Sequence, residues 1–146
     1  MGTFASLSKR LDVAIADLPQ MIDRAVLENR SEMIDLNTAQ LSQGKNSLGE
    51  LLERYATDSY AQYKKAIGSQ APDGVPNLYL EGDFYEGFYI EKDGDDYIMF
   101  SKDGKAGELG AKYGFDIFGL SEASLAEVLP NILEDFLTDL RKTLRL

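Results

Sequence analysis

A long amphipathic pattern near the C-terminus constrains the fold of this chain more than any other feature. Apolar residues recur there every three or four positions: Leu125, Val128, Leu129, Ile132, Leu133, Phe136, Leu137, Leu140 and Leu144. This spacing predicts a helix over residues 121–146, with Ser121 as its cap. Because proline cannot donate a backbone hydrogen bond, Pro130 predicts a kink or a restart within this helix.

The N-terminal third shows the same kind of spacing. Its first apolar residues recur every three or four positions: Phe4, Leu7, Leu11, Ala14 and Ile15. Pro19 then interrupts the pattern, and Asp17 is placed to cap a second helix that extends to about Asn37. The pattern weakens after that point, so we expect helices within residues 1–43.

Residues 44–120 predict mixed structure with one small antiparallel sheet. Phe88–Glu91 and Tyr97–Ser101 have strand-like composition, and they flank the turn dipeptide Asp93-Gly94. Two such runs around an Asp-Gly turn are typical of a hairpin. We therefore expect a hairpin at about residues 88–101.

Shorter features complete the expected fold. A short helix is predicted to begin at Thr57 or Asp58 and to end before Gly68. The sequence "KDGKAGELG" after the hairpin predicts a second turn, and Phe84 and Phe88 are expected to enter the core. With 146 residues, the chain is expected to form a single α+β domain.

The chain contains no cysteine and no histidine. Disulfides, thiolate metal sites, cysteine nucleophiles and Ser-His triads are therefore excluded. The sequence also lacks an apolar run long enough to cross a bilayer, so we expect no association with a membrane.

The net charge of −10 is distributed unevenly. Residues 1–70 hold 9 acidic and 8 basic side chains, whereas residues 71–146 hold 16 and 7. Within Asp73–Asp103, nine acids face two lysines, a local charge of −7. Such a surface repels phosphate, so sequence-specific binding of nucleic acid is not expected. It can instead meet a basic partner, or line a passage through which nucleic acid slides.

The acidic residues do not follow a known catalytic or ion-binding pattern. The segment "EKDGDDYIMFSKD" has its glycine at the wrong position for an EF-hand loop and lacks the closing glutamate. Two carboxylate pairs, Asp83 with Glu86 and Glu81 with Glu91, have the residue types of a glycosidase, but a small and largely helical chain offers little room for the required cleft. The glycines follow neither the P-loop nor the dinucleotide pattern. We expect no catalytic residue, no metal and no cofactor.

The segment "EGDFYEGFYIE" (residues 81–91) and the strand after it combine aromatic and acidic side chains. Tyr85, Tyr89 and Tyr97 are candidates for a protein–protein interface, because tyrosine is enriched in interfaces. The acids of the region form a second candidate surface: Glu91, Asp93, Asp95, Asp96 and Asp103.

Three stretches between about Leu36 and Leu120 follow a recognisable order. The first contains Gly44, Gly49, Tyr55, Lys64 and Gly68. The second, a turn that enters a sheet, contains Leu80, Gly82, Phe84 and Gly87. The third, after the hairpin, is Tyr113-Gly114. This order resembles that of phage virion-morphogenesis proteins, the tail-completion and head–tail joining families.

The resemblance implies a non-enzymatic structural protein that assembles, commonly as a ring, at the end of a phage tail or at the neck between capsid and tail. Its implied partners are other virion proteins of the neck or tail and further copies of itself. Its implied location is the virion, reached from the host cytoplasm during assembly. In such a ring the acidic candidate surface would face the channel, where DNA passes without binding.

A second interpretation depends only on charge. A small acidic protein can mimic the charge of DNA and so bind a basic partner. A mimic of this kind needs its charge spread along one extended face. Here the acids are concentrated in one segment, so the structural interpretation is preferred.

Overall fold

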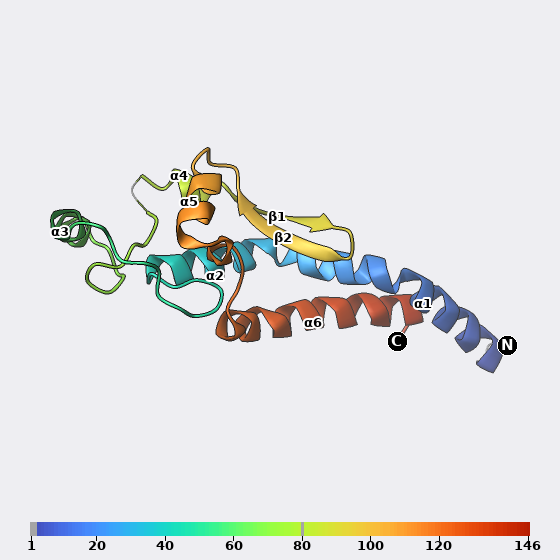
Figure 1. The fold of residues 1–146 in the computed structure, drawn as a ribbon. Coiled ribbons are helices and arrows are strands. Elements are labelled where there is room, and N and C mark those ends of the chain that lie inside the picture. The colour runs from blue at the N-terminus through green and yellow to red at the C-terminus, as the bar shows by residue number, and fades with distance from the viewer. Residues whose placement is uncertain (1–2, 80) are drawn as a thin grey trace. The chain divides into compact units, whose positions relative to one another are not determined.

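The structure is a computed structural model, which describes residues 3–79 and 81–146 (Figure 1). It confirms the predicted α+β class, with long helices towards both ends of the sequence and an antiparallel hairpin between them. The chain forms two compact units. We name the described residues up to Arg30, together with Glu127–Leu146, the helical unit, and Ser31–Ala126 the mixed unit. The single domain stays a prediction.

The helical unit consists of two antiparallel helices (Figure 1). One is α1 (Thr3–Glu28), and the other is the part of α6 (Glu122–Leu144) that begins at Glu127. α6 packs against α1. The apolar side chains buried in this unit are Ala14, Met21, Ala25 and Val128.

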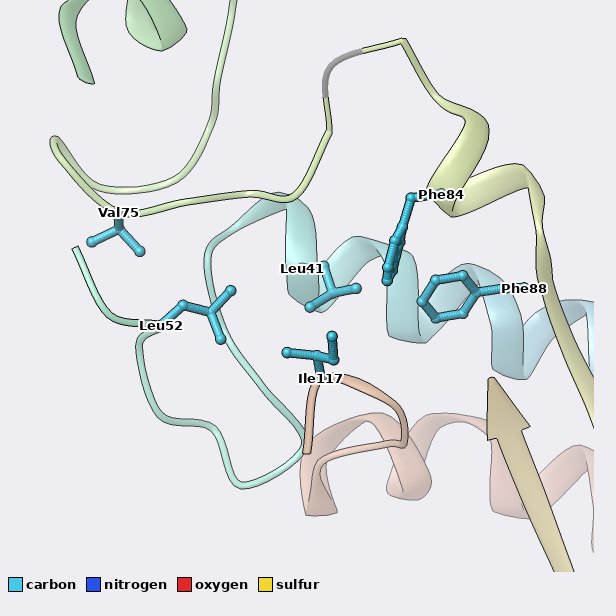
Figure 2. Close-up of a cluster of buried hydrophobic side chains, with 6 residues drawn as sticks. All are labelled: Leu41, Leu52, Val75, Phe84, Phe88 and Ile117. Atoms are coloured by element: carbon cyan, nitrogen blue, oxygen red, sulfur yellow. The ribbon is translucent and has the colours of Figure 1, made fainter. Parts of the chain in front are cut away.

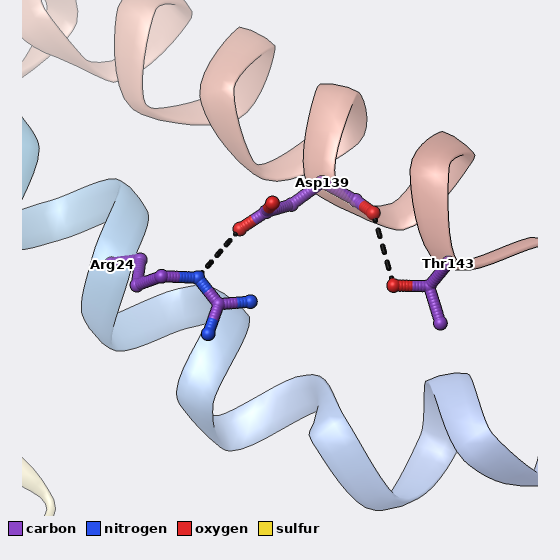
Figure 3. Close-up of polar contacts among 3 residues, drawn as sticks. All are labelled: Arg24, Asp139 and Thr143. Carbon is purple, nitrogen blue, oxygen red and sulfur yellow. Dashed lines mark hydrogen bonds and ion pairs between the residues drawn. The ribbon is translucent and has the colours of Figure 1, made fainter.

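Polar contacts fix the register of the two helices. The Nε of Arg24 on α1 donates to Asp139 on α6 at 2.9 Å, and within α6 the hydroxyl of Thr143 donates to the carbonyl of Asp139 at 3.2 Å (Figure 3). Near the end of α6, the Nη1 of Arg10 donates to the carbonyl of Leu144 at 2.8 Å. α1 therefore begins beyond the end of α6, and its first turns extend past that helix (Figure 1).

Two prolines lie inside these helices. The predicted interruption at Pro19, with Asp17 as the cap of a new helix, is wrong, because α1 is continuous from Thr3 to Glu28. A proline removes one backbone hydrogen bond, and the packing of α1 against α6 stabilises the helix on both sides of it. α6 likewise continues through Pro130, so the helix does not restart there; the kink stays a prediction.

The mixed unit holds the remaining elements, the first of which begins at its boundary. They are α2 (Arg30–Ser42), α3 (Asp58–Ala66), α4 (Asp83–Glu86), β1 (Phe88–Asp93), β2 (Asp96–Ser101), α5 (Ala106–Tyr113) and the 3-10 helix η1 (Phe115–Ile117). The predicted hairpin at 88–101 is confirmed: β1 and β2 pair antiparallel, from Phe88 opposite Ser101 to Asp93 opposite Asp96.

Two local predictions for this unit have opposite outcomes. The short helix after Thr57 is confirmed as α3, and the backbone N–H of Tyr60 donates to the Thr57 hydroxyl at 3.4 Å. The turn predicted for "KDGKAGELG" is wrong in its second half, where α5 begins at Ala106. Asp103 completes the turn early by accepting from the N–H of Lys105 at 2.8 Å, and burial of Ala106 then favours a helix.

The core of the mixed unit is a cluster of six buried side chains (Figure 2). They are Leu41, Leu52, Val75, Phe84, Phe88 and Ile117. The ring centroids of Phe84 and Phe88 lie 5.1 Å apart, and Phe118 stacks on Phe84 at 5.8 Å. The prediction that both Phe84 and Phe88 enter the core is confirmed.

Two amides on α2 hold the chain segment that leads into α6. Asn37 is fully buried; its Nδ2 donates to the carbonyl of Ile117 at 2.9 Å, and its Oδ1 accepts from the N–H of Gly119 at 2.7 Å. Gln40, one turn later, donates to the carbonyl of Gly119 at 3.0 Å and accepts from the N–H of Ser121 at 2.8 Å. The hydroxyl of Ser121 accepts from the N–H of Ser124 at 3.2 Å, which confirms Ser121 as the cap of α6.

Candidate functional site

One line of large apolar side chains on α1 is exposed. They are Phe4, Leu11, Ile15 and Ile22, with exposed fractions of 85%, 43%, 64% and 46%. Their spacings of seven, four and seven residues place them within about 20° of one line along a helix with 3.6 residues per turn. The buried Ala14, Met21 and Ala25 lie about a quarter turn away. α1 thus exposes larger side chains than most of those it buries.

α6 adds two exposed leucines to the same side of the helical unit. Leu129 and Leu133 are 58% and 52% exposed, and they lie about 100–140° around α6 from the buried Val128. On each helix, the rotation from the buried line to the exposed line has the same sense as the turn of the helix from its N-terminus to its C-terminus. Because α1 and α6 run antiparallel, this rotation carries both lines to one side of the pair. We name these six exposed residues the apolar face.

The charged groups of the helical unit lie away from this face. Arg24 pairs with Asp139 (Figure 3). At 100° per residue it lies about 160° around α1 from Ile22. Val13 lies about half a turn from the line of exposed residues, and it is the exposed apolar side chain on the other side of α1, at 54%. The helical unit therefore has one contiguous apolar side and one polar side.

The mixed unit contains a separate feature, a pocket of about 520 Å³ lined by four tyrosines. These are Tyr55, Tyr60, Tyr79 and Tyr113. The rings of Tyr55 and Tyr60 meet edge to face, with centroids 5.0 Å apart. Glu81, Asp83 and Asp103 contribute acids to the lining, and Lys105 and Lys112 contribute bases. We name this feature the tyrosine pocket.

A buried amine also lines the tyrosine pocket. Lys64 is 3% exposed, and its Nζ donates to the backbone carbonyl of Tyr79. Burial lowers the pKa of Lys64, because the charged form loses its hydration. Burial, with a smaller contribution from the neighbouring Tyr60, raises the pKa of Tyr55 to about 12. The amine is occupied by the carbonyl of Tyr79, so the pocket presents tyrosine rings together with the exposed acids and bases of its lining.

The three tyrosines predicted as an interface do not share a surface. The hydroxyl of Tyr85 donates to the carbonyl of Asn77, and burial raises the pKa of that hydroxyl. Tyr89 lies opposite Phe100 in the hairpin, whereas Tyr97 lies opposite Lys92. Because successive side chains alternate between the faces of a strand, Tyr89 and Tyr97 project to opposite faces of the hairpin.

Four of the five acids of the predicted surface lie on the hairpin, and Asp103 lies apart from them. Glu91, Asp93 and Asp96 are exposed and share one face, and Asp95 is exposed in the turn. Asp103 lies beyond β2, where it caps a turn and lines the tyrosine pocket. No three or more of the acidic residues within the described parts of the chain are grouped so as to hold a metal ion.

The glycines of the sequence motifs have structural roles. A side chain at Gly44 would approach Cγ1 of Val75 to 2.5 Å, and one at Gly87 would approach the hydroxyl of Ser101 to 2.6 Å. Gly82 has a left-handed backbone with φ of +93°. Leu80 lies outside the described residues. The motif glycines therefore set the path of the chain through the core.

The apolar face and the tyrosine pocket were not predicted from the sequence. A helical-wheel plot shows an apolar stripe on α1, but it does not show which part of that stripe contacts α6. The pocket had a weaker signal, since Tyr55, Tyr60 and Tyr63 precede Lys64 at short intervals. Both features depend on contacts between distant segments.

Comparisons of the chain with models of protein families, with curated proteins and with solved structures find no match. Among the helices of residues 3–79 and 81–146, none combines the length and apolar character needed to cross a membrane.

Proposed function

We propose that this chain is a non-enzymatic structural protein of a phage virion, located in the tail or at the head–tail neck. It acts by binding other virion proteins and copies of itself, as part of a ring-like connector or a tail-completion complex. The observation that carries the proposal is the apolar face of the helical unit.

The size of the apolar face favours an assembly role. Complete burial of a large apolar side chain contributes about 1.5–3 kcal/mol. The six side chains of the face are 43–85% exposed, so a partner that covers them all gains roughly 5–10 kcal/mol before the cost of association. Contiguous exposed apolar surface of this kind is typical of interaction sites.

The sequence resemblance supplies the virion context of the proposal. Gly44, Gly87 and Lys64, which carry part of that resemblance, are tightly packed or buried in the mixed unit. These residues have structural roles in the mixed unit, and the apolar face lies outside the resembling segment. The resemblance itself therefore does not imply assembly through the helical unit; the proposal adds this point.

The acidic face of the hairpin fits a channel in the assembled ring. Glu91, Asp93 and Asp96 point to one side and would repel the phosphates of passing DNA. The alternative, a mimic of DNA charge that binds a basic protein, has less support, because Asp103 is separated from the hairpin acids. Location of the hairpin acids on the outer rim of a ring would contradict the channel role.

Mass spectrometry of purified phage particles, from cells that carry and express the gene, tests the proposed function. Peptides of the chain are expected in the particle fraction. Deletion of the gene is expected to leave unjoined heads and tails, or tails without their end structure, in negative-stain micrographs. Complete, infectious particles from the deletion strain would contradict the proposal.

A further inference from the structure

We infer that the tyrosine pocket binds a saccharide built of neutral hexose units. The pocket belongs to the mixed unit and the apolar face to the helical unit, so the inference goes beyond the proposed function and does not depend on it. The pocket volume of about 520 Å³ is within the range of sites that hold small molecules, about 300–1,000 Å³. The charge, the aromatic rings and the free hydrogen-bonding groups of the lining together select a ligand of this class.

The charged side chains of the lining balance one another in number. Three are acids and three are lysines: Glu81, Asp83, Asp103, Lys64, Lys105 and Lys112. None of the six forms an ion pair with another described residue. A ligand with a net charge is therefore attracted by one set and repelled by the other, whereas a neutral ligand that has both donors and acceptors can bind both sets.

Two contacts argue further against a charged ligand. The ammonium of Lys112 lies 5.1 Å from the centroid of the Tyr113 ring, which is the position that a cationic ligand takes over an aromatic ring. Lys64 is 3% exposed and donates to the carbonyl of Tyr79, so little of it is open to a ligand anion. Residues 31–126 hold 17 acids and 8 bases, and the field of this unit also repels anions.

The tyrosine rings provide surfaces for the apolar side of a sugar ring. Tyr60 and Tyr79 are 42% and 45% exposed, and Tyr55 and Tyr113 are partly exposed. In a hexose, the C–H groups on one face of the ring are slightly positive, and they pack against the negative face of an aromatic ring. A saccharide therefore gains contacts with these rings that a small polar ion does not make.

The rings are held in place without a ligand. Tyr55 meets Tyr60 edge to face with centroids 5.0 Å apart, and Tyr79 meets Tyr85 in the same way at 5.2 Å. Gly82 leaves room for Tyr79, since a Cβ at this position would lie 3.3 Å from the Tyr79 hydroxyl. Because the rings are already ordered, a ligand loses little free energy in fixing their rotamers.

The hydroxyl groups at the edge of a sugar ring match the charged part of the lining. Glu81 and Asp83 are exposed acceptors, and Lys105 and Lys112 are exposed donors. A hydroxyl group can donate to the carboxylates and accept from the amines, and hydrogen bonds with a charged partner are stronger than those between neutral groups. One hexose carries several hydroxyls, so it can bind acids and amines at the same time.

Saturation-transfer NMR titrations with monosaccharides test the charge of the ligand. Glucose, galactose and mannose are each compared with the corresponding amino sugar and uronic acid, which keep the ring and add one charge of either sign. At least one neutral hexose is expected to bind, and roughly tenfold more tightly than both of its charged forms. Tighter binding of either charged form would overturn the inference.

The disaccharides maltose, cellobiose and lactose distinguish two sources of the ligand. Tighter binding of a disaccharide than of its hexose units supports a site for part of a glycan chain. Equal binding supports a site for a free sugar. If the hexoses and the disaccharides all fail to bind, the inference is wrong.

Two tyrosines of α3 form a matched pair that tests the location of the site. Tyr60 is among the described residues that line the tyrosine pocket, whereas Tyr63 is not. Tyr63 is 49% exposed, and its ring centroid lies 5.9 Å from that of Tyr60. Tyr60→Ala is expected to weaken saccharide binding roughly tenfold, and Tyr63→Ala is expected to leave it unchanged.

Circular dichroism of both variants checks that they fold, which is expected because both side chains are exposed. Equal effects of the two variants on saccharide binding would overturn the assignment to the tyrosine pocket. These measurements are independent of particle composition, so the saccharide site can fail while the proposed virion function stands.

Discussion

Replacement of Gly44 by alanine is expected to destabilise the mixed unit by about 3 kcal/mol. Gly44 has a φ of +76°, and an added Cβ would lie 2.5 Å from Cγ1 of the buried Val75 and 3.2 Å from Cβ of Ala71. A left-handed backbone costs alanine about 1–2 kcal/mol, and reduced freedom of the unfolded chain returns about 0.4–1 kcal/mol. Overpacking against Val75 adds about 1–3 kcal/mol.

Gly49 provides a matched control for the contribution of packing. Its φ is +77°, but a Cβ there would meet no atom within 4 Å. Gly49→Ala therefore carries only the backbone strain and the gain from the unfolded chain, a net loss of about 1 kcal/mol. The difference of about 2 kcal/mol between the two variants measures the contact of Gly44 with Val75.

Urea unfolding followed by circular dichroism measures both losses. Both glycines lie in the mixed unit, so they report on the same part of the structure. The free energies are compared only if the slopes of the two transitions agree. Equal losses for the two variants would refute the reasoning, since they would show that Val75 moves aside at little cost.

Three further predictions concern other parts of the chain. Asn37→Leu leaves the carbonyl of Ile117 and the N–H of Gly119 without their partner, and it is expected to lower the free energy of unfolding in urea by about 2–4 kcal/mol. The control Gln43→Leu, at an exposed position, should change it by less than about 0.5 kcal/mol. The pKa of Tyr55 is about 12 in the folded chain and 10.0 in the unfolded chain, so the free energy of unfolding falls as pH rises through that interval. Tyr55→Phe should reduce the slope of this fall. An unchanged slope would contradict the raised pKa of Tyr55. Arg24→Ala breaks a partly exposed ion pair with Asp139 and should lower the free energy of unfolding by less than about 1 kcal/mol, as measured by thermal unfolding. A loss above about 2 kcal/mol would show that the pair stabilises the packing of α1 and α6 more than an exposed ion pair does.

The elements that the sequence predicted correctly are those determined by neighbouring residues. The hairpin needed only two strand-like runs around Asp93-Gly94, and the cap of α6 needed only Ser121 before an apolar pattern. α1 shows the opposite case. Pro19 is a local signal for a break, but contacts with a helix more than 100 residues away keep α1 continuous. Sequence reasoning had no access to those contacts.

The candidate surfaces were harder to predict because they depend on which side of an element is covered. The tyrosines near the hairpin have the composition of an interface, yet strand alternation and the pairing register separate Tyr89 from Tyr97. The acids Glu91, Asp93 and Asp96 do share a face, since they occupy alternate or directly paired positions. Asp103 differs from them because its carboxylate caps a turn. Composition identified the residue types but not their arrangement.

The contrast between the buried and exposed sides of α1 connects the stability of the helical unit to its assembly. Burial of Ala14 and Ala25 removes little apolar area from water, because an alanine side chain is a single methyl group. The larger gain is available from Phe4, Ile15 and Ile22, which remain exposed until a partner covers them. A ligand that binds only the folded state stabilises it by mass action, and a second copy acts in the same way. A partner that covered this face would therefore stabilise the folded helical unit as well as the assembly.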